Sequence, residues 1–155
     1  QKLRISKIIV NYLFGNISGK KIAILGFSFK ANTNDTRQSP SISISKDLIE
    51  EGAHLSIYDP KVEKYKIEKD LENKEKNCLS KFDYGTYEIC SSVNDAALKS
   101  DAIVILTEWE EFNSLNWYDL FKVMRKPSWL FDTRACIDYE KAKKAGFNIW
   151  RLGNS

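Results

Sequence analysis

An apolar run that ends in a glycine, followed by a polar loop and a helix start, lies near the beginning of the chain. The run covers residues 22–25, and Gly26 follows it directly. After the loop, Ser39 and Pro40 favour the start of a helix. Serine can cap the free N–H groups of a first turn, and proline fits there because its missing N–H is not needed. The order strand, loop, helix is typical of the opening unit of a parallel α/β sheet, whose loop lies where such folds bind ligands.

The same alternation of strands and helices continues to the end of the chain. Short apolar or alternating segments predict strands at residues 21–26, 54–59, 86–90, 102–106, 129–131 and 147–150. Helical spacing and helix boundaries predict helices at residues 40–51, 62–71, 92–99, the second half of 109–125, and 139–145. In the first of these helices the predicted inner stripe is Ile42, Ser45, Leu48 and Ile49. We therefore expect a doubly wound, Rossmann-like α/β fold with a mainly parallel sheet of about six strands.

The first residues already show helical spacing of apolar side chains. These residues are Ile5, Ile8, Ile9, Tyr12 and Leu13. The chain starts at Gln1, with neither a methionine nor a helix cap before the pattern begins. We interpret residues 1–18 as the end of a longer connecting helix with a linker and residues 19–155 as one domain. The whole chain is interpreted as a piece of a longer protein.

Composition and charge exclude several classes of function. The chain has 155 residues, is 43% hydrophobic and carries a net charge of +3, with basic and acidic residues interleaved. The small net charge does not favour nucleic acid as a partner, and the longest apolar runs are far too short to span a membrane. The cysteines favour a cytoplasmic protein. We interpret the charged stretch at residues 61–81 as a solvated face, with a docking patch as the alternative. Cys78, Cys90 and Cys136 lack metal-site spacing, so reduced thiols, buried in the case of Cys90 and Cys136, are expected.

The loop after the first strand departs from the glycine pattern that cradles dinucleotides. In G-x-G-x-x-G the second glycine lets the backbone approach a pyrophosphate closely. The matching positions here are Gly26, Ser28 and Ala31. A loop that cannot approach as closely can instead extend a cation, and Lys30 is placed to do so. We therefore expect a charged contact to a nucleotide diphosphate and no NAD cradle of the usual kind in this domain.

Three polar segments follow predicted strands that this topology brings together. They are residues 28–37, 107–109 and 132–134. In a doubly wound sheet the first and fourth strands are neighbours at the point where the strand order reverses, and ligands bind in the crevice there. The fold prediction therefore places these segments along one crevice.

Four sequence motifs carry a resemblance to a known family. They read GFSFKANTNDTR at residues 26–37, EGAHLSIYDPKV at 51–62, ILTEW at 105–109 and FDTR at 131–134. Their order and spacing resemble the C-terminal, UDP-binding domain of the UDP-glucose/GDP-mannose dehydrogenase family, and in particular the UDP-glucose 6-dehydrogenases. The resemblance implies a whole enzyme that oxidises UDP-glucose to UDP-glucuronate with two NAD⁺.

The resemblance also implies roles for individual residues. Phe29, Lys30 and Arg134 would contact the UDP-sugar substrate, and Arg37 would reach the pyrophosphate of NAD across a domain cleft. Each cation also has a purely local interpretation. Lys30 could be an exposed loop lysine, Arg37 could pair with Asp35, and Arg134 could pair with Asp132. The position of Thr133 in that motif is often glycine in the family, so a glycine-specific backbone shape is not expected here.

Structural interpretations are preferred for five further polar or reactive residues. Trp109 is expected to pack against a crevice wall and Glu108 to pair with a nearby base, with a pocket-lining role as the alternative. Asp59 precedes a proline, which favours a turn over a ribose contact. His54 has no acid or nucleophile beside it, and Cys136 has no local histidine to activate it.

The segment that carries the family's catalytic cysteine, of the type G-G-x-C-[FL]-P-K-D, does not occur in this sequence. We therefore expect no catalytic residue in the chain, no dehydrogenase activity of the isolated chain, and NAD bound mainly by a missing N-terminal domain. The resemblance implies homo-oligomerisation through the central helix. The alternatives are a related UDP-N-acetylhexosamine or GDP-mannose dehydrogenase, a stand-alone nucleotide-binding regulatory module, and an oligomerisation domain.

Overall fold

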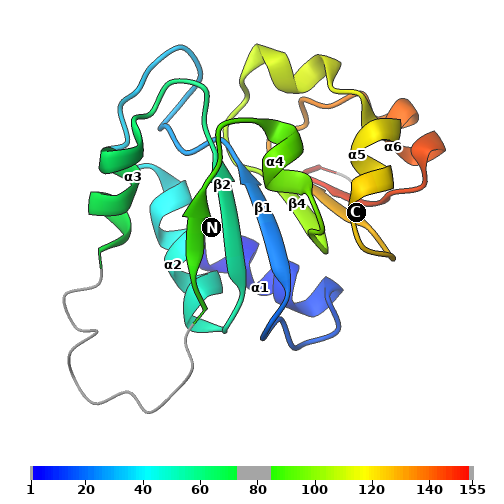
Figure 1. Ribbon diagram of the computed structural model, residues 1–155, viewed down its shortest axis with the longest axis horizontal. Coiled ribbons are helices and arrows are strands. Elements are labelled where there is room, and N and C mark those ends of the chain that lie inside the picture. The colour runs from blue at the N-terminus through cyan, green and yellow to red at the C-terminus, as the bar shows by residue number, and fades with distance from the viewer. Residues whose placement is uncertain (1, 73–84, 154–155) are drawn as a thin grey trace.

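A single parallel sheet forms the centre of the molecule. The computed structural model describes residues 2–72 and 85–153. Its sheet has six strands in the order β3-β2-β1-β4-β5-β6, and every neighbouring pair is parallel (Figure 1). The strands are β1 (Lys21–Leu25), β2 (His54–Tyr58), β3 (Tyr87–Ile89), β4 (Ala102–Ile105), β5 (Trp129–Asp132) and β6 (Asn148–Arg151). The predicted doubly wound α/β fold is confirmed, with all six strands close to their expected positions.

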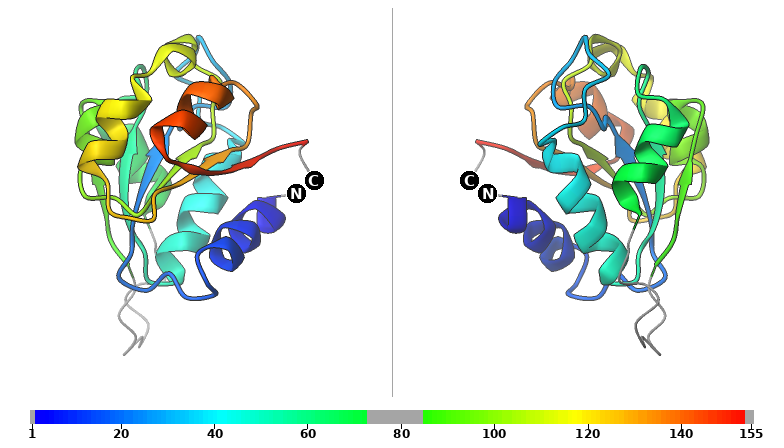
Figure 2. Two further views of the ribbon diagram at one scale, coloured as in Figure 1. Left: turned by 90° about the vertical axis from the view of Figure 1, so that its right-hand side faces the viewer. Right: turned by 90° about the vertical axis from the view of Figure 1, so that its left-hand side faces the viewer.

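Helices cover both faces of this sheet. They are α1 (Lys2–Tyr12), α2 (Pro40–Glu50), α3 (Lys64–Leu71), α4 (Val93–Ala97), the 3₁₀ helix η2 (Glu110–Ser114), α5 (Trp117–Val123) and α6 (Tyr139–Ala145). One face packs against α1, α2 and α3, and the other against α4, α5 and α6 (Figure 2). None of the described helices is long and apolar enough to cross a bilayer. Cys78 and much of the charged stretch at 61–81 lie outside the described residues.

The apolar runs of the central strands are explained by these two helical layers. In β1, Ile22 and Ile24 belong to the core on the side of α1 and α2, whereas Ala23 and Leu25 belong to the core on the opposite side. All four residues are fully buried. A strand that alternates between two cores needs apolar side chains at every position, which is typical of parallel sheets covered on both faces.

The start of α2 confirms the expected capping. Ser39 Oγ accepts a hydrogen bond from the backbone N–H of Ser41 at 3.2 Å, and Pro40 is the first helical residue. The predicted inner stripe is partly wrong, because Ile44 is buried and Ile42 only partly so. The buried stripe begins at Ser41, whose hydroxyl donates to the Gly26 carbonyl at 3.3 Å. A pattern based on polarity could not place this serine in the interior.

The N-terminal helix α1 is an integral part of the fold. Ile9 and Leu13 are buried beside α2, and the Tyr12 ring meets Trp129 and Phe131 edge-on at centroid distances of 5.5 and 6.2 Å. The helix expected from the apolar spacing of the first residues is thus confirmed, and it ends at Tyr12. It covers the β5 side of the face that α2 and α3 leave open.

Candidate functional site

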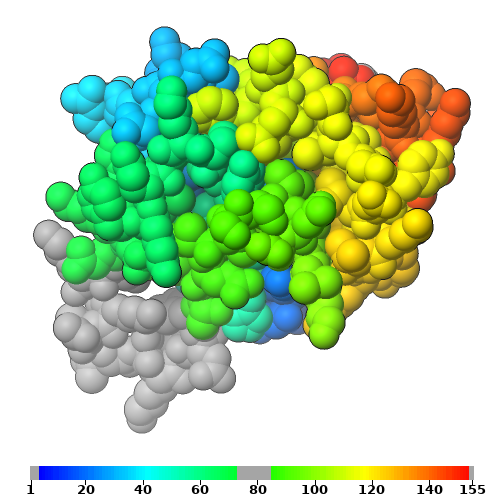
Figure 3. Space-filling model, turned by 45° about the horizontal axis from the view of Figure 1, so that its top comes forward, coloured from blue at the N-terminus to red at the C-terminus, as the bar shows by residue number. Residues whose placement is uncertain are grey.

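The carboxyl ends of the parallel strands lie along one edge of the molecule. This edge carries the segments after β1, β4 and β5, which hold the predicted site residues (Figure 1). The segment after β1 and the segment after β4 lie side by side on its surface, as Figure 3 shows in light blue and yellow-green. Because β1 and β4 are hydrogen-bonded neighbours, they mark the point where the strand order reverses, which is the usual ligand site of such sheets.

A close contact between Gly26 and Thr107 joins the first two segments. Gly26 has φ +94°, and a Cβ added there would lie 2.5 Å from the Thr107 Cβ. The Thr107 hydroxyl donates a hydrogen bond to the Ser28 carbonyl at 2.9 Å. Glycine is therefore needed at position 26 both for its backbone conformation and for the space that Thr107 occupies. The contact fixes the loop after β1 against the end of β4.

Asp59, at the end of β2, also holds this loop. Its Oδ1 accepts the backbone N–H groups of Lys61 and Val62 at 2.9 and 3.0 Å, which confirms the predicted turn. Its Oδ2 accepts the backbone N–H groups of Phe27 and Ser28 at 2.7 and 3.0 Å. Oδ2 further accepts the indole N–H of Trp109 at 3.2 Å, and Trp109 is buried as expected of a wall residue. The sequence did not predict these three additional hydrogen bonds.

Lys30 and Phe29 lie at the exposed tip of the same loop. Phe29 is 45% exposed and its backbone N–H donates to the Asp35 carbonyl at 2.7 Å. The Ser28 hydroxyl donates to the Lys30 carbonyl at 2.8 Å, so the backbone around Lys30 is fixed while its side chain is exposed. Within the described residues no acceptor or carboxylate pairs with the Lys30 ammonium group. The ammonium is thus available to an anion from outside.

Arg37 adopts the local pairing that the sequence left open. Its Nε and Nη2 atoms donate to Asp35 Oδ1 and Oδ2 at 3.0 and 2.9 Å, and 88% of its side chain is exposed. Hydrogen bonds from the Arg37 side chain and backbone lower the pKa of Asp35 to about 2. The guanidinium is therefore neutralised by a carboxylate that stays ionised. An incoming phosphate would have to share Arg37 with Asp35.

Arg134 is held by one edge of its guanidinium. Its Nε donates to the Leu106 carbonyl at 3.1 Å and lies 3.1 Å from Glu108 Oε2. This agrees with the expected pairing of Glu108 with a base. Asp132 does not pair with the guanidinium; it accepts the backbone N–H of Arg134 at 3.1 Å. Nη1 and Nη2 make no hydrogen bond to the described residues, so a forked donor edge remains for a ligand.

Thr133 occupies the third position of the FDTR motif, which is often glycine in the family that the sequence resembles. Its hydroxyl donates to the Ile105 carbonyl at 2.6 Å, and its backbone N–H donates to the same carbonyl at 3.3 Å. These bonds fasten the segment after β5 to the end of β4. Together with Thr107, they connect three adjacent strand ends into one continuous support for Lys30 and Arg134.

The other reactive side chains take structural roles. His54 Nδ1 contacts the Thr86 hydroxyl at 2.8 Å at the opposite end of β2. Cys90 and Cys136 are free thiols, but both are half-buried rather than buried as expected. Burial, and then the nearby Asp132 and Glu108 carboxylates, raise the pKa of Cys136 to about 12. The described residues contain no cluster of three or more metal-ligating side chains.

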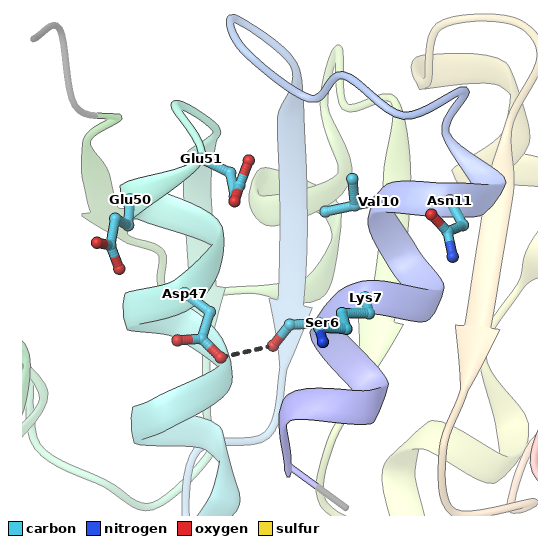
Figure 4. A pocket seen from close by; sticks show the side chains of 7 residues that line it. All are labelled: Ser6, Lys7, Val10, Asn11, Asp47, Glu50 and Glu51. Carbon is cyan, nitrogen blue, oxygen red and sulfur yellow. Dashed lines mark hydrogen bonds between the residues drawn. The ribbon is translucent and has the colours of Figure 1, made fainter.

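A groove of about 270 Å³ lies away from this edge, between α1 and α2. Ser6, Lys7 and Asn11 of α1 and Asp47 and Glu50 of α2 are among the residues that line it, and Figure 4 shows Ser6 and Asp47 pointing toward each other between the helices. The Ser6 hydroxyl donates to Asp47 Oδ2 across it at 2.9 Å. None of the predicted site residues lines the groove. We interpret it as a polar surface between two packed helices.

Comparison of the sequence with curated proteins finds UDP-glucose 6-dehydrogenases. The chain is 40% identical over 153 residues to UDP-glucose 6-dehydrogenase of Drosophila melanogaster and 38% identical over 168 residues to UDP-glucose 6-dehydrogenase 1 of Arabidopsis thaliana. Each match covers 99% of this chain, and 32% and 34% of the respective relative. The chain thus spans about a third of the length of these curated relatives.

Solved structures share the fold at lower identity. The crystal structure of NDP-N-acetyl-D-galactosaminuronic acid dehydrogenase from Methanosarcina mazei Go1 superposes with a TM-score of 0.74 at 22% identity, covering 99% of this chain and 29% of that one. A UDP-glucose dehydrogenase from Pyrobaculum islandicum gives a TM-score of 0.64 at 19% identity, covering 97% of this chain and 29% of that one.

Residues 23–139 match the family described as "UDP-glucose/GDP-mannose dehydrogenase family, UDP binding domain". The chain therefore belongs to the UDP-glucose/GDP-mannose dehydrogenase family and contains its UDP-binding domain.

Proposed function

We propose that this chain holds the UDP part of UDP-glucose in an NAD-dependent protein that oxidises this sugar nucleotide to UDP-glucuronate. The observation that carries the proposal is the state of Arg134, whose Nε is anchored at the end of β4 while its Nη edge has no protein partner among the described residues. A forked edge of this kind suits the oxygens of a diphosphate. The identity of 34 to 40% to UDP-glucose 6-dehydrogenases favours UDP-glucose over other sugar nucleotides.

Lys30 supplies the second positive charge of the proposed site. It extends from the loop after β1, whereas Arg134 follows β5, and β4 lies between these two strands. Two cations on a fixed support offset the charge of a diphosphate and hold its sugar in place, so that the bound substrate keeps one orientation. Phe29, exposed beside Lys30, is proposed to contact the same substrate.

The residues of this domain do not fit the pyrophosphate of NAD in the usual loop. Ser28 stands where the second glycine of the dinucleotide pattern would be, and the N–H groups of Phe27 and Ser28 already donate to Asp59. We therefore assign NAD to the rest of the whole protein, with Arg37 as the proposed contact from this domain. Residues 1–18 would join the two parts, and α1 would contribute to a homo-oligomer.

Calorimetric titration of the chain with UDP-glucose, UDP, GDP-mannose and NAD⁺ tests the proposal. We expect UDP and UDP-glucose to bind more tightly than GDP-mannose and NAD⁺, and R134A to weaken UDP binding. Tighter binding of NAD⁺, or UDP affinity that R134A leaves unchanged, would refute the assignment. R125A is the matched control, because Arg125 lies at the opposite edge of the sheet, 3.7 Å from Asp101.

A further inference from the structure

Asp59 collects N–H donors from two separate segments of the proposed site. Its Oδ2 atom accepts from Phe27 and Ser28 in the loop after β1, at 2.7 and 3.0 Å, and from the Trp109 indole after β4, at 3.2 Å. Its Oδ1 atom accepts two N–H groups of its own turn. Both oxygens are therefore engaged, so Asp59 is not free to hold a ribose hydroxyl as an acid at this strand end does in dinucleotide folds.

The two backbone N–H groups that Asp59 accepts at Oδ2 belong to the loop after β1, which binds phosphate in other folds. In dinucleotide folds the glycine loop after the first strand brings its backbone against a pyrophosphate, and successive N–H groups of a turn form a concave anion site. Here a carboxylate of the chain itself takes the N–H groups of Phe27 and Ser28. An anion from outside would have to displace this carboxylate.

We propose that Asp59 is an internal anion that fills the backbone anion site after β1 and positions the Phe29–Lys30 tip together with Trp109. The phosphates of the ligand are thereby directed to the side chains of Lys30 and Arg134. This inference rests on the proposed function and adds a positioning residue to it.

The loop geometry shows how Asp59 acts on Lys30. Ser28 donates its backbone N–H to Asp59, its hydroxyl to the Lys30 carbonyl, and accepts the Thr107 hydroxyl at its own carbonyl. Ser28 is 1% exposed, so a shift of its backbone is transmitted to the loop tip and to the end of β4. Removal of the carboxylate leaves these buried donors without a partner, which favours a different loop conformation.

UDP titration of D59A and D101A separates positioning from general stability. Asp101 is the matched control, because its Oδ2 accepts the backbone N–H of Lys21 at 2.9 Å, at the other end of β1. We expect D59A to bind UDP about tenfold or more weakly, whereas D101A changes the affinity by less than about twofold. Amide hydrogen exchange of the free proteins should accelerate at Phe27 and Ser28 in D59A and at Lys21 in D101A.

Equal UDP affinity in folded D59A and D101A would overturn the inference, as would unchanged exchange at Phe27 and Ser28. If D59A does not fold, D59N takes its place. Its amide cannot satisfy the donors on both sides, so weaker UDP binding and faster exchange are again expected, and unchanged values refute the role. Failure of the wild-type chain to bind UDP would count against the proposed function, and the exchange data alone would then decide the role of Asp59.

Discussion

The Nε atom of Arg134 lies 3.1 Å from Oε2 of Glu108, in the segment that follows the neighbouring strand. The two side chains are 34% and 43% exposed, so water screens their attraction. Glu108 therefore partly offsets the positive charge of Arg134 that the proposed ligand would meet, and the Arg134 side chain stays partly exposed. The Leu106 carbonyl holds the same Nε and would keep Arg134 in place without Glu108.

Replacement of Glu108 by glutamine should strengthen UDP binding. E108Q removes a carboxylate that competes with phosphate for Arg134, and an exposed pair of this kind is worth a factor of about two to five in affinity. Calorimetry at low ionic strength measures the gain, which added salt should reduce. E111Q removes the same charge at Glu111, whose carboxylate accepts the Tyr58 hydroxyl at 3.0 Å, and should have a smaller effect. Weaker binding by E108Q would show that Glu108 supports the ligand directly.

Substitution of Gly26 by alanine should destabilise the fold strongly. The new Cβ would lie 2.5 Å from Thr107 Cβ, and φ +94° is strained for alanine. We expect a loss of about 2–4 kcal/mol in the free energy of unfolding, from backbone strain and overpacking together. Urea denaturation measures it. G15A is the control, because Gly15 has φ +82° but no atom within 4 Å of its added Cβ, so it should lose only about 1–2 kcal/mol. Equal losses would show that the Thr107 contact is unimportant.

The fold could be predicted from the sequence because its strands are short, apolar and separated by clear helix boundaries. Ser39 and Pro40 mark the start of α2, and Gly146, a glycine in a left-handed conformation, ends α6. The parallel order then follows from the alternation of strands and helices. The stripe of α2 was predicted only in part: Ser45 and Leu48 are buried as expected, whereas Ser41 and Ile44 are buried in place of Ile42 and Ile49. Ser41 is buried through a hydrogen bond, which hydrophobicity does not report.

The site was predicted less completely than the fold. Sequence order shows that the segments after β1, β4 and β5 meet, but it does not show which donors converge on one carboxylate. Asp59 was therefore recognised as a turn residue, while its bonds to Ser28 and Trp109 span separations of 31 and 50 residues. The role of Glu108 as the partner of Arg134 likewise depends on side-chain directions at adjacent strand ends.

The carboxyl group of Asp35 should titrate near pH 2 in the folded chain. Hydrogen bonds from Arg37 lower its pKa to about 2 from the ordinary value of 3.8. Because the folded pKa is the lower one, the pair contributes stability above about pH 4 and loses it as the pH falls towards 2. Carboxyl carbon NMR measures the midpoint, which R37M should raise. K66M is the control, since Lys66 contributes less to the lowering. An unchanged midpoint in R37M would contradict the observed pairing.

Cys136 should react slowly with alkylating reagents at neutral pH. Its pKa is raised to about 12, mainly by burial and then by Asp132 and Glu108, so little thiolate is present. In a chain with Cys78 and Cys90 replaced by serine, iodoacetamide labelling at pH 7.5 follows Cys136 alone. The rate should rise steeply in alkaline solution and should reach that of an ordinary thiol in urea. A folded rate equal to the rate in urea would contradict the raised pKa. A folded rate above the rate in urea would mean that the thiol is activated, and would reopen its assignment as a structural residue.

Removal of the Lys30 ammonium should weaken UDP binding without disturbing the fold. The side chain is exposed and has no partner among the described residues, so its loss leaves no buried group unpaired. A charged contact to a phosphate is worth about tenfold in affinity, and K30A should lose that amount while its urea midpoint stays unchanged. K46A is the control for charge alone, because Lys46 is an exposed lysine on α2. If Lys30 acted only by long-range attraction between its charge and UDP, K30A and K46A would lose the same amount of affinity. A loss confined to K30A would instead require direct contact between Lys30 and the ligand, and equal affinity of K30A and wild type would remove Lys30 from the site.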